Sequence, residues 1–148
     1  MKKVFTIIIL MLAFVVEAQS QTNLQIAELF NGSYKRQDNA IEVVVKGNQL
    51  ERYKLEVFRS LTIKNDPKDF ERIKKLVEQD EKNAISKETG RIGERLYYAF
   101  YCFSPQKGRF RYIFYRNSSL RKTESNELTL IYMEGNVTMD ELKVMFKK

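Results

Sequence analysis

LYYAFYCFSPQKGRFRYIFYR, which spans residues 96–116, contains two segments rich in aromatic residues on either side of a polar loop. Aromatic and β-branched residues favour strands, whereas Pro105 and Gly108 lie in the loop, where turn residues are expected. This stretch therefore predicts an antiparallel hairpin whose strands cover residues 96–103 and 109–116.

Three further strands are expected outside this hairpin. Residues 41–46 are rich in valine and isoleucine and are followed by Gly47-Asn48, which suits a two-residue hairpin turn. The return strand then covers residues 49–59, and the last strand covers residues 127–134. Together with the central hairpin, these segments predict a sheet of about five strands.

Three helices are expected from the spacing of apolar residues and from capping residues. The first covers residues 22–30, where apolar side chains recur at helical spacing. The second covers residues 67–82 and follows the capping residue Asp66. The third is introduced near the C-terminus by a capping box formed by Thr138 and Glu141.

The order of these elements predicts the fold class. Residues 83–93, between the second helix and the central hairpin, are polar and are expected to form a mobile loop. Hairpins connect most neighbouring strands, so the sheet should be largely antiparallel, with the helices covering one of its faces. We therefore predict a two-layer α+β fold in a single domain over residues 19–148.

Residues 1–18 have the layout of a cleavable secretory signal peptide. Lys2 and Lys3 precede an apolar stretch from Val4 to Val16, and Val16-Glu17-Ala18 places small residues at the −3 and −1 positions of a cleavage site. The apolar stretch has thirteen residues, fewer than the roughly 20 that a membrane-spanning helix needs. We expect an exported protein without a transmembrane segment in its mature chain; a retained N-terminal anchor is the alternative.

The composition argues against most catalytic sites. The chain has no histidine and a single cysteine, Cys102, so Ser-His-Asp and Cys-His arrangements and an internal disulfide are excluded. Cys102 lies among aromatic residues of a predicted strand, where a packing role is expected. Carboxylates such as Asp80 and Glu88 are expected to be surface charges. We therefore predict no catalytic residues, no metal site and no cofactor.

A possible binding surface comes from the alternation of side chains along the central hairpin. It predicts that Phe110, Tyr112 and Phe114 face the helices, while Arg109, Arg111, Ile113 and Tyr115 face outward. Tyrosine and arginine are favoured in binding interfaces, although a solvated sheet face covered by tyrosines is the alternative. The candidate binding residues, which would share this outer face, are Tyr97, Tyr101, Arg109, Arg111, Tyr115 and Arg116.

The net charge of +7 favours anionic partners. Residues 107–115 have a faint similarity to an RNA-binding strand, in which basic and aromatic residues stack on bases, but Arg109 occupies a position where an aromatic residue is expected. No nucleic-acid partner is therefore expected.

Residues 55–62, 112–117 and 128–142 resemble a family of short exported Gram-negative bacterial proteins of unknown function. The last of these stretches has the strand, turn and helix with which such proteins end. The resemblance extends from about residue 55 to the C-terminus and is one of layout. It implies an α+β fold and a location in the periplasm or cell envelope, and it transfers no catalytic residues.

Three functions remain open. The first is a non-enzymatic envelope protein that acts as a binding or accessory module, with another envelope protein, an anionic glycan or a lipid headgroup as its partner. The second is a periplasmic hydrolase with paired carboxylates. The third is a structural protein whose sheet face closes a homodimer. A deep site with two facing carboxylates, one of them with a raised pKa, would favour the hydrolase.

Overall fold

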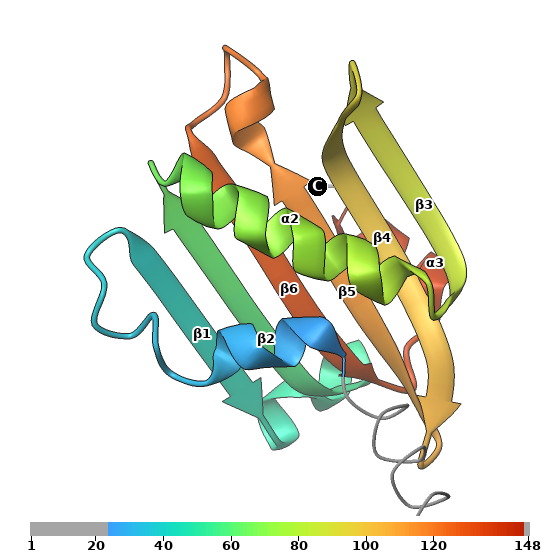
Figure 1. Ribbon diagram of the computed structural model, residues 1–148. Helices are drawn as coiled ribbons and strands as arrows, with labels where there is room; N and C mark the ends of the chain where they lie inside the picture. The colour runs from blue at the N-terminus through green and yellow to red at the C-terminus, as the bar shows by residue number, and fades with distance from the viewer. Residues whose placement is uncertain (1–23, 147–148) are drawn as a thin grey trace, which may run out of the picture.

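The computed structural model describes residues 24–146, which form a six-stranded antiparallel sheet with helices on both faces (Figure 1). The strands lie in the order β1-β2-β6-β5-β4-β3. The predicted signal peptide lies outside the described residues. In chain order, the elements are η1 (Gln25–Phe30), β1 (Ala40–Lys46), η2 (Asn48–Tyr53), β2 (Leu55–Lys64), α2 (Pro67–Glu81), β3 (Ala84–Ile92), β4 (Arg95–Gln106), β5 (Arg109–Asn117), η3 (Ser118–Leu120), β6 (Glu127–Gly135) and α3 (Met139–Phe146), where η denotes a 3₁₀ helix.

The first face of the sheet is covered by α2 and η1, which cross it in Figure 1. Phe70, Ile73 and Val77 form the apolar stripe of α2 and are buried against the sheet. The predicted start of α2 is confirmed, because the Asp66 side chain accepts a hydrogen bond of 3.1 Å from the backbone N–H of Asp69. The helix thus carries the chain from β2 across the sheet to β3 at the far edge.

The second face is covered only in part, by α3 and η2, which lie over one half of the length of the strands. Leu142 of α3 is buried among Met133, Val137 and Tyr112, and the Tyr112 hydroxyl donates a hydrogen bond of 2.6 Å to the Val137 carbonyl. In the other half of the second face several side chains of the strands remain at least partly accessible, among them Tyr98, Arg116 and Thr129. None of the helices within residues 24–146 has the length and apolar character needed to cross a membrane.

The capping box of α3 is confirmed. The Thr138 hydroxyl accepts a hydrogen bond of 3.2 Å from the Glu141 N–H, and the Glu141 carboxylate accepts one of 3.3 Å from the Thr138 N–H. We expect Thr138→Ala to lower the free energy of unfolding by about 1 kcal/mol, because the helix loses its cap. Urea denaturation measures this loss. Val144→Ala, at an exposed position of the same helix, is the control and should change stability little; equal midpoints for both variants would contradict the capping role.

Most of residues 83–93, predicted as a mobile loop, belong to strand β3 (Ala84–Ile92), so the sheet has six strands rather than five. β3 lies at the edge of the sheet, pairs only with β4 among the described strands, and is mostly exposed. An exposed edge strand needs no apolar alternation, since backbone hydrogen bonds to β4 hold it in place. Its polar sequence therefore gave no sign of a strand.

Three other expectations were wrong in detail. Gly47-Asn48 does not form a two-residue turn: Asn48 begins η2, whose Leu50 is buried on the second face, and β2 starts only at Leu55. The first helix is the 3₁₀ helix Gln25–Phe30 rather than an α-helix. Helices also cover both faces of the sheet, because side chains on both faces of its central strands are apolar.

Candidate functional site

The six predicted binding residues do not share one outer surface. Tyr101, Arg111 and Tyr115 lie beneath α2 on the first face and are 0%, 5% and 0% exposed. The alternation along β5 was right, but the side chains predicted to face outward, Arg111, Ile113 and Tyr115, are buried on the face that α2 covers. Phe110, Tyr112 and Phe114 face the α3 side, and Ile113 and Tyr115 face α2. Both sets of side chains are apolar enough to be covered, so the alternation alone could not decide which set meets the longer helix.

The other three predicted residues are accessible, but Arg109 lies apart from Tyr97 and Arg116. Arg109 lies near the β4–β5 turn, where it forms ion pairs with Glu56 at 2.7 Å and Glu134 at 3.4 Å. Arg116 lies on the open half of the second face, with its guanidinium 5.4 Å from the centre of the Tyr97 ring. Only Tyr97 and Arg116 of the predicted set therefore come together at an accessible site.

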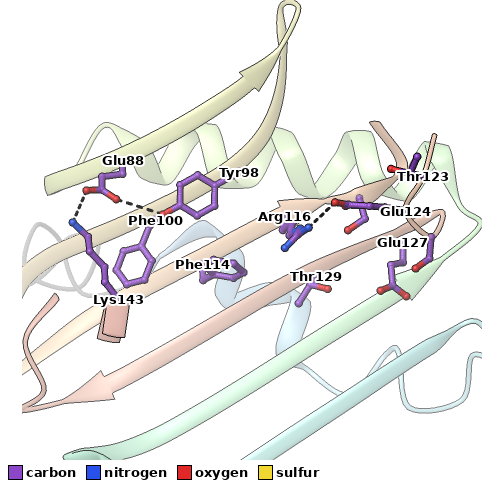
Figure 2. A pocket seen from close by; sticks show the side chains of 12 residues that line it. Glu88, Tyr98, Phe100, Phe114, Arg116, Thr123, Glu124, Glu127, Thr129 and Lys143 are labelled. Atoms are coloured by element: carbon purple, nitrogen blue, oxygen red, sulfur yellow. Dashed lines mark hydrogen bonds and ion pairs between the residues drawn. The ribbon is translucent and has the colours of Figure 1, made fainter. Parts of the chain in front are cut away.

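The open half of the second face is hollowed into a groove of about 860 Å³, which we call the aromatic groove (Figure 2). Its floor consists of Tyr98, Phe100 and Phe114 from the central hairpin. The Tyr98 and Phe114 rings meet edge to face with their centres 5.7 Å apart, and Phe100 and Phe114 do so at 6.2 Å. The groove is lined by Glu88, Tyr98, Phe100, Phe114, Arg116, Ser118, Thr123, Glu124, Ser125, Glu127, Thr129 and Lys143.

The register of the sheet explains why these residues come together. One row of directly paired residues crosses all six strands and consists of Val43, Ser60, Ile131, Phe114, Phe100 and Glu88. The next row consists of Ile41, Thr62, Thr129, Arg116, Tyr98 and Gly90. Side chains in neighbouring rows of one face stand side by side, so the aromatic floor on β4 and β5 continues into hydroxyl groups on β6 and β2.

One end of the aromatic groove is closed by an ion pair between α3 and β3. Lys143 donates a hydrogen bond to Glu88, and this bond is the main cause that raises the pKa of the Lys143 ammonium. The Tyr98 hydroxyl lies 3.5 Å from the same carboxylate. Lys143 and Glu88 are 55 residues apart in the chain, so no local sequence pattern connects them.

The other end is closed by a cluster around Glu124, in the segment between β5 and β6. Arg116 forms an ion pair with Glu124 at 2.8 Å, and the Tyr97 hydroxyl donates to the same carboxylate at 3.0 Å. Although desolvation opposes them, the Tyr97 hydroxyl and Arg116 lower the pKa of the Glu124 carboxyl. The Arg121 guanidinium also belongs to this cluster and lies over the Tyr97 ring, 4.5 Å from its centre. Glu124 is thus held in its ionised form as a hydrogen-bond acceptor.

A second polar cluster is buried under α2 and does not belong to the aromatic groove. Asp80 is 2% exposed, contrary to the expectation of a surface charge, and accepts hydrogen bonds from the N–H groups of Gln25 at 2.7 Å and Ile26 at 3.1 Å. Burial raises the pKa of this carboxyl, while those two bonds and the Arg111 guanidinium oppose the rise. Asp80 therefore fastens η1 to α2.

The described residues contain few other candidates for chemistry. Cys102 is buried, and burial raises the pKa of its thiol. Within residues 24–146, no three acidic or cysteine side chains gather in a way that could hold a metal ion.

Residues 13–146 match a family described as a family of unknown function, DUF6108. The chain belongs to this family. The match is wider than the resemblance found from about residue 55 onward, and it includes every strand of the DUF6108 fold described above. No curated protein and no solved structure matches the chain.

The sequence alone does not indicate most of the aromatic groove of this DUF6108 member. Phe114 was expected to face the helices, Glu88 was expected to be a surface charge, and Glu124 lies in the polar stretch 117–126, which was expected only to connect two strands. The alternation of Tyr98 and Phe100 along β4 does carry a signal, because it places both rings on one face. Tyr98 and Phe114 remain partly exposed on this face, whereas Phe100 is buried in the cluster that packs against α3.

Proposed function

We propose that this protein is an exported, non-enzymatic binding module that holds a neutral glycan in the aromatic groove. The observation that carries this proposal is an aromatic floor between two ion pairs, Lys143 with Glu88 and Arg116 with Glu124. Export rests on the layout of residues 1–18.

A glycan fits the two kinds of surface in the groove. The C–H faces of a sugar ring can pack against the partly exposed Tyr98 and Phe114 rings, where many small dispersion contacts add up. The hydroxyl groups of Thr123, Ser125 and Thr129 can both donate and accept hydrogen bonds with sugar hydroxyls. Apolar walls with a few convergent polar groups are typical of ligand sites.

The charges of the groove favour a neutral ligand over an anionic one. Its lining contains the cations Arg116 and Lys143 and the carboxylates Glu88, Glu124 and Glu127. Both cations already have carboxylate partners, so an anionic ligand would have to compete for them. The anionic glycan or lipid headgroup expected from the net charge is therefore less favoured at this site, and it becomes an alternative outcome of the experiment below.

The geometry also favours binding over hydrolysis. A glycosidase needs one carboxylic acid with a raised pKa beside the bond that it cleaves. In the groove, Glu88 and Glu124 lie at opposite ends, each in an ion pair (Figure 2), and the pKa of Glu124 is lowered. Asp80 does have a raised pKa, but it lies beneath η1, away from the groove.

Isothermal titration with maltohexaose, cellohexaose and chitohexaose tests the proposal. We expect at least one of these neutral sugars to bind, and Tyr98→Ala to weaken that binding about tenfold, or ~1.4 kcal/mol, because the floor loses a ring. Tyr53→Ala removes an exposed tyrosine outside the groove and should bind like the wild type. Thermal melts establish that both variants fold.

Three outcomes would contradict the proposal. The first is that none of the three sugars binds. The second is that the protein binds heparin in a salt-sensitive way that Tyr98→Ala leaves unchanged, which would support a polyanion partner held elsewhere. The third is that mass spectrometry finds shortened sugars after incubation, which would support the hydrolase.

A further inference from the structure

β1 is the less protected of the two edges of the sheet. Ile41, Val43 and Val44 are 58%, 42% and 46% exposed, so apolar side chains project from both faces of this strand. Edge strands are usually protected by charges, bulges or a covering segment, because their outer backbone groups can pair with another chain. Among the described residues, β1 has a strand partner on one side only, β2.

The opposite edge provides an internal comparison. β3 has two irregularities in its register with β4, one between Ala84 and Ser86 and one between Gly90 and Arg91, and it carries Lys87 in its exposed middle. The register of β1 with β2 is regular from Ala40 to Lys46. The chain therefore protects β3 by the usual devices and leaves β1 straight and apolar.

Hydrogen bonding shows which backbone groups of β1 point outward. The Lys64 N–H donates to the Asn39 carbonyl at 2.8 Å, in the same register that pairs Ala40 with Ile63. In an antiparallel pair, hydrogen-bonded and non-hydrogen-bonded residues alternate, so the odd-numbered residues of β1 bond to β2. The N–H and C=O groups of Glu42, Val44 and Lys46 therefore point away from the sheet. The outward N–H of Ala40 is used by the turn, where it donates to Gln37.

We infer that two copies of this chain pair through β1, antiparallel, with Val44 opposite Val44 of the second copy. This register places the outward backbone groups of both strands opposite each other. It also places Glu42 opposite Lys46 of the second copy on both sides of the two-fold axis, and cross-strand pairs of opposite charge stabilise a sheet. On the other face, Val43 lies opposite Val45.

The neighbouring register is less complementary. Pairing centred on Val43 would also align outward backbone groups, but it sets Glu42 opposite Val44 and Lys46 opposite Ala40. In addition, Glu42 has a buried oxygen, Oε2, for which the described residues provide no hydrogen-bond donor. The ammonium of Lys46 from a second copy brings a positive charge to this carboxylate, which favours the register centred on Val44.

The dimer would join two sheets into one, with both aromatic grooves on the same side. Side chains of directly opposite residues project from the same face of a sheet, so the two-fold axis runs perpendicular to it. A single strand pair buries less than the ~800 Å² per partner of a standard interface. We therefore expect the dimer to dissociate on dilution.

Sedimentation velocity over a range of concentrations tests this inference, with protein purified after expression of the full chain. The wild type should shift from monomer to dimer as concentration rises. Val44→Lys places two lysines opposite each other and should give monomer throughout, while Ile85→Lys makes the same change at an exposed position of β3 and should behave like the wild type. Circular dichroism verifies that the variants fold.

A charge exchange tests the register itself. Lys46→Glu, at an exposed position, should weaken the dimer, since two carboxylates would then meet. Adding Glu42→Lys to that variant should restore it. A wild type that stays monomeric at every concentration, a dimer that survives both Val44→Lys and Lys46→Glu, or a dimer lost with Ile85→Lys would overturn the inference.

Discussion

Gly135→Ala is expected to lower the free energy of unfolding by about 3 kcal/mol or more, because overpacking and lost backbone hydrogen bonds act together. A Cβ atom at this position would lie 2.3 Å from the Lys54 carbonyl oxygen and 2.7 Å from the Leu55 Cα. Both are backbone atoms, so no side-chain rotation can relieve the clash. The Lys54 carbonyl is also fixed, since it accepts hydrogen bonds of 3.0 Å from the Asn136 N–H and 3.1 Å from the Val137 N–H.

Gly90→Ala is the matched control for this prediction. Gly90 also lies in a strand, but the nearest atoms to an added Cβ belong to the Tyr98 side chain at 3.6 Å and 3.8 Å, which is ordinary contact. This variant should unfold within about 0.5 kcal/mol of the wild type. Urea denaturation followed by circular dichroism measures both changes. If Gly135→Ala unfolds at the same urea concentration as Gly90→Ala, the close approach of β6 to Lys54 does not exist in solution.

Asp80→Ala should cost about 3–5 kcal/mol, because two backbone N–H groups at the start of η1 are left without an acceptor. The N–H groups of Gln25 and Ile26 would lose their acceptor, and the carboxylate that opposes the charge of Arg111 would be absent. Gln79→Ala, at an exposed position of the same helix, is the control and should stay within about 0.5 kcal/mol of the wild type. Equal denaturation midpoints for the two variants would show that η1 is not held by Asp80.

The pH dependence of Asp80→Asn tests the environment of the carboxyl separately. Because burial raises the folded-state pKa of Asp80, its contribution to stability is complete below the unfolded-state pKa and is lost as the pH rises through the folded-state pKa. Asparagine does not titrate. The stability difference between wild type and Asp80→Asn should therefore be smaller at about pH 7 than at about pH 4. A difference that grows with pH would mean that the folded-state pKa is lowered instead.

Local sequence signals predicted the parts of the fold that local physics determines. The hairpin over residues 96–116, the start of α2 at Asp66 and the capping box at Thr138 each depend on residues close together in the chain, and all three are confirmed. β3 was missed because an edge strand is held by backbone bonds to its neighbour rather than by its own apolar side chains.

The candidate site depends on long-range placement, and the sequence could not provide it. The alternation along β5 separated Tyr115 from Phe114 correctly, but the choice of which ring remains accessible depends on where α2 and α3 pack. Arg116 was predicted as a binding residue and does line the aromatic groove. Its partner Glu124 lies in a segment expected only to connect strands, and no periodic pattern marks such a residue.

The position of β6 has a consequence for the order in which the molecule can form. β6 lies between β2 and β5, yet among the strands of residues 24–146 it comes last in the chain. Until Glu127–Gly135 has emerged, the β1–β2 ladder and the β3–β4–β5 ladder have no shared strand to join them. Pairings between residues far apart in the chain form slowly, because the entropy of closing a long loop is lost before their contacts form. The nascent chain therefore lacks the strand that joins its two ladders until Glu127–Gly135 has been synthesised.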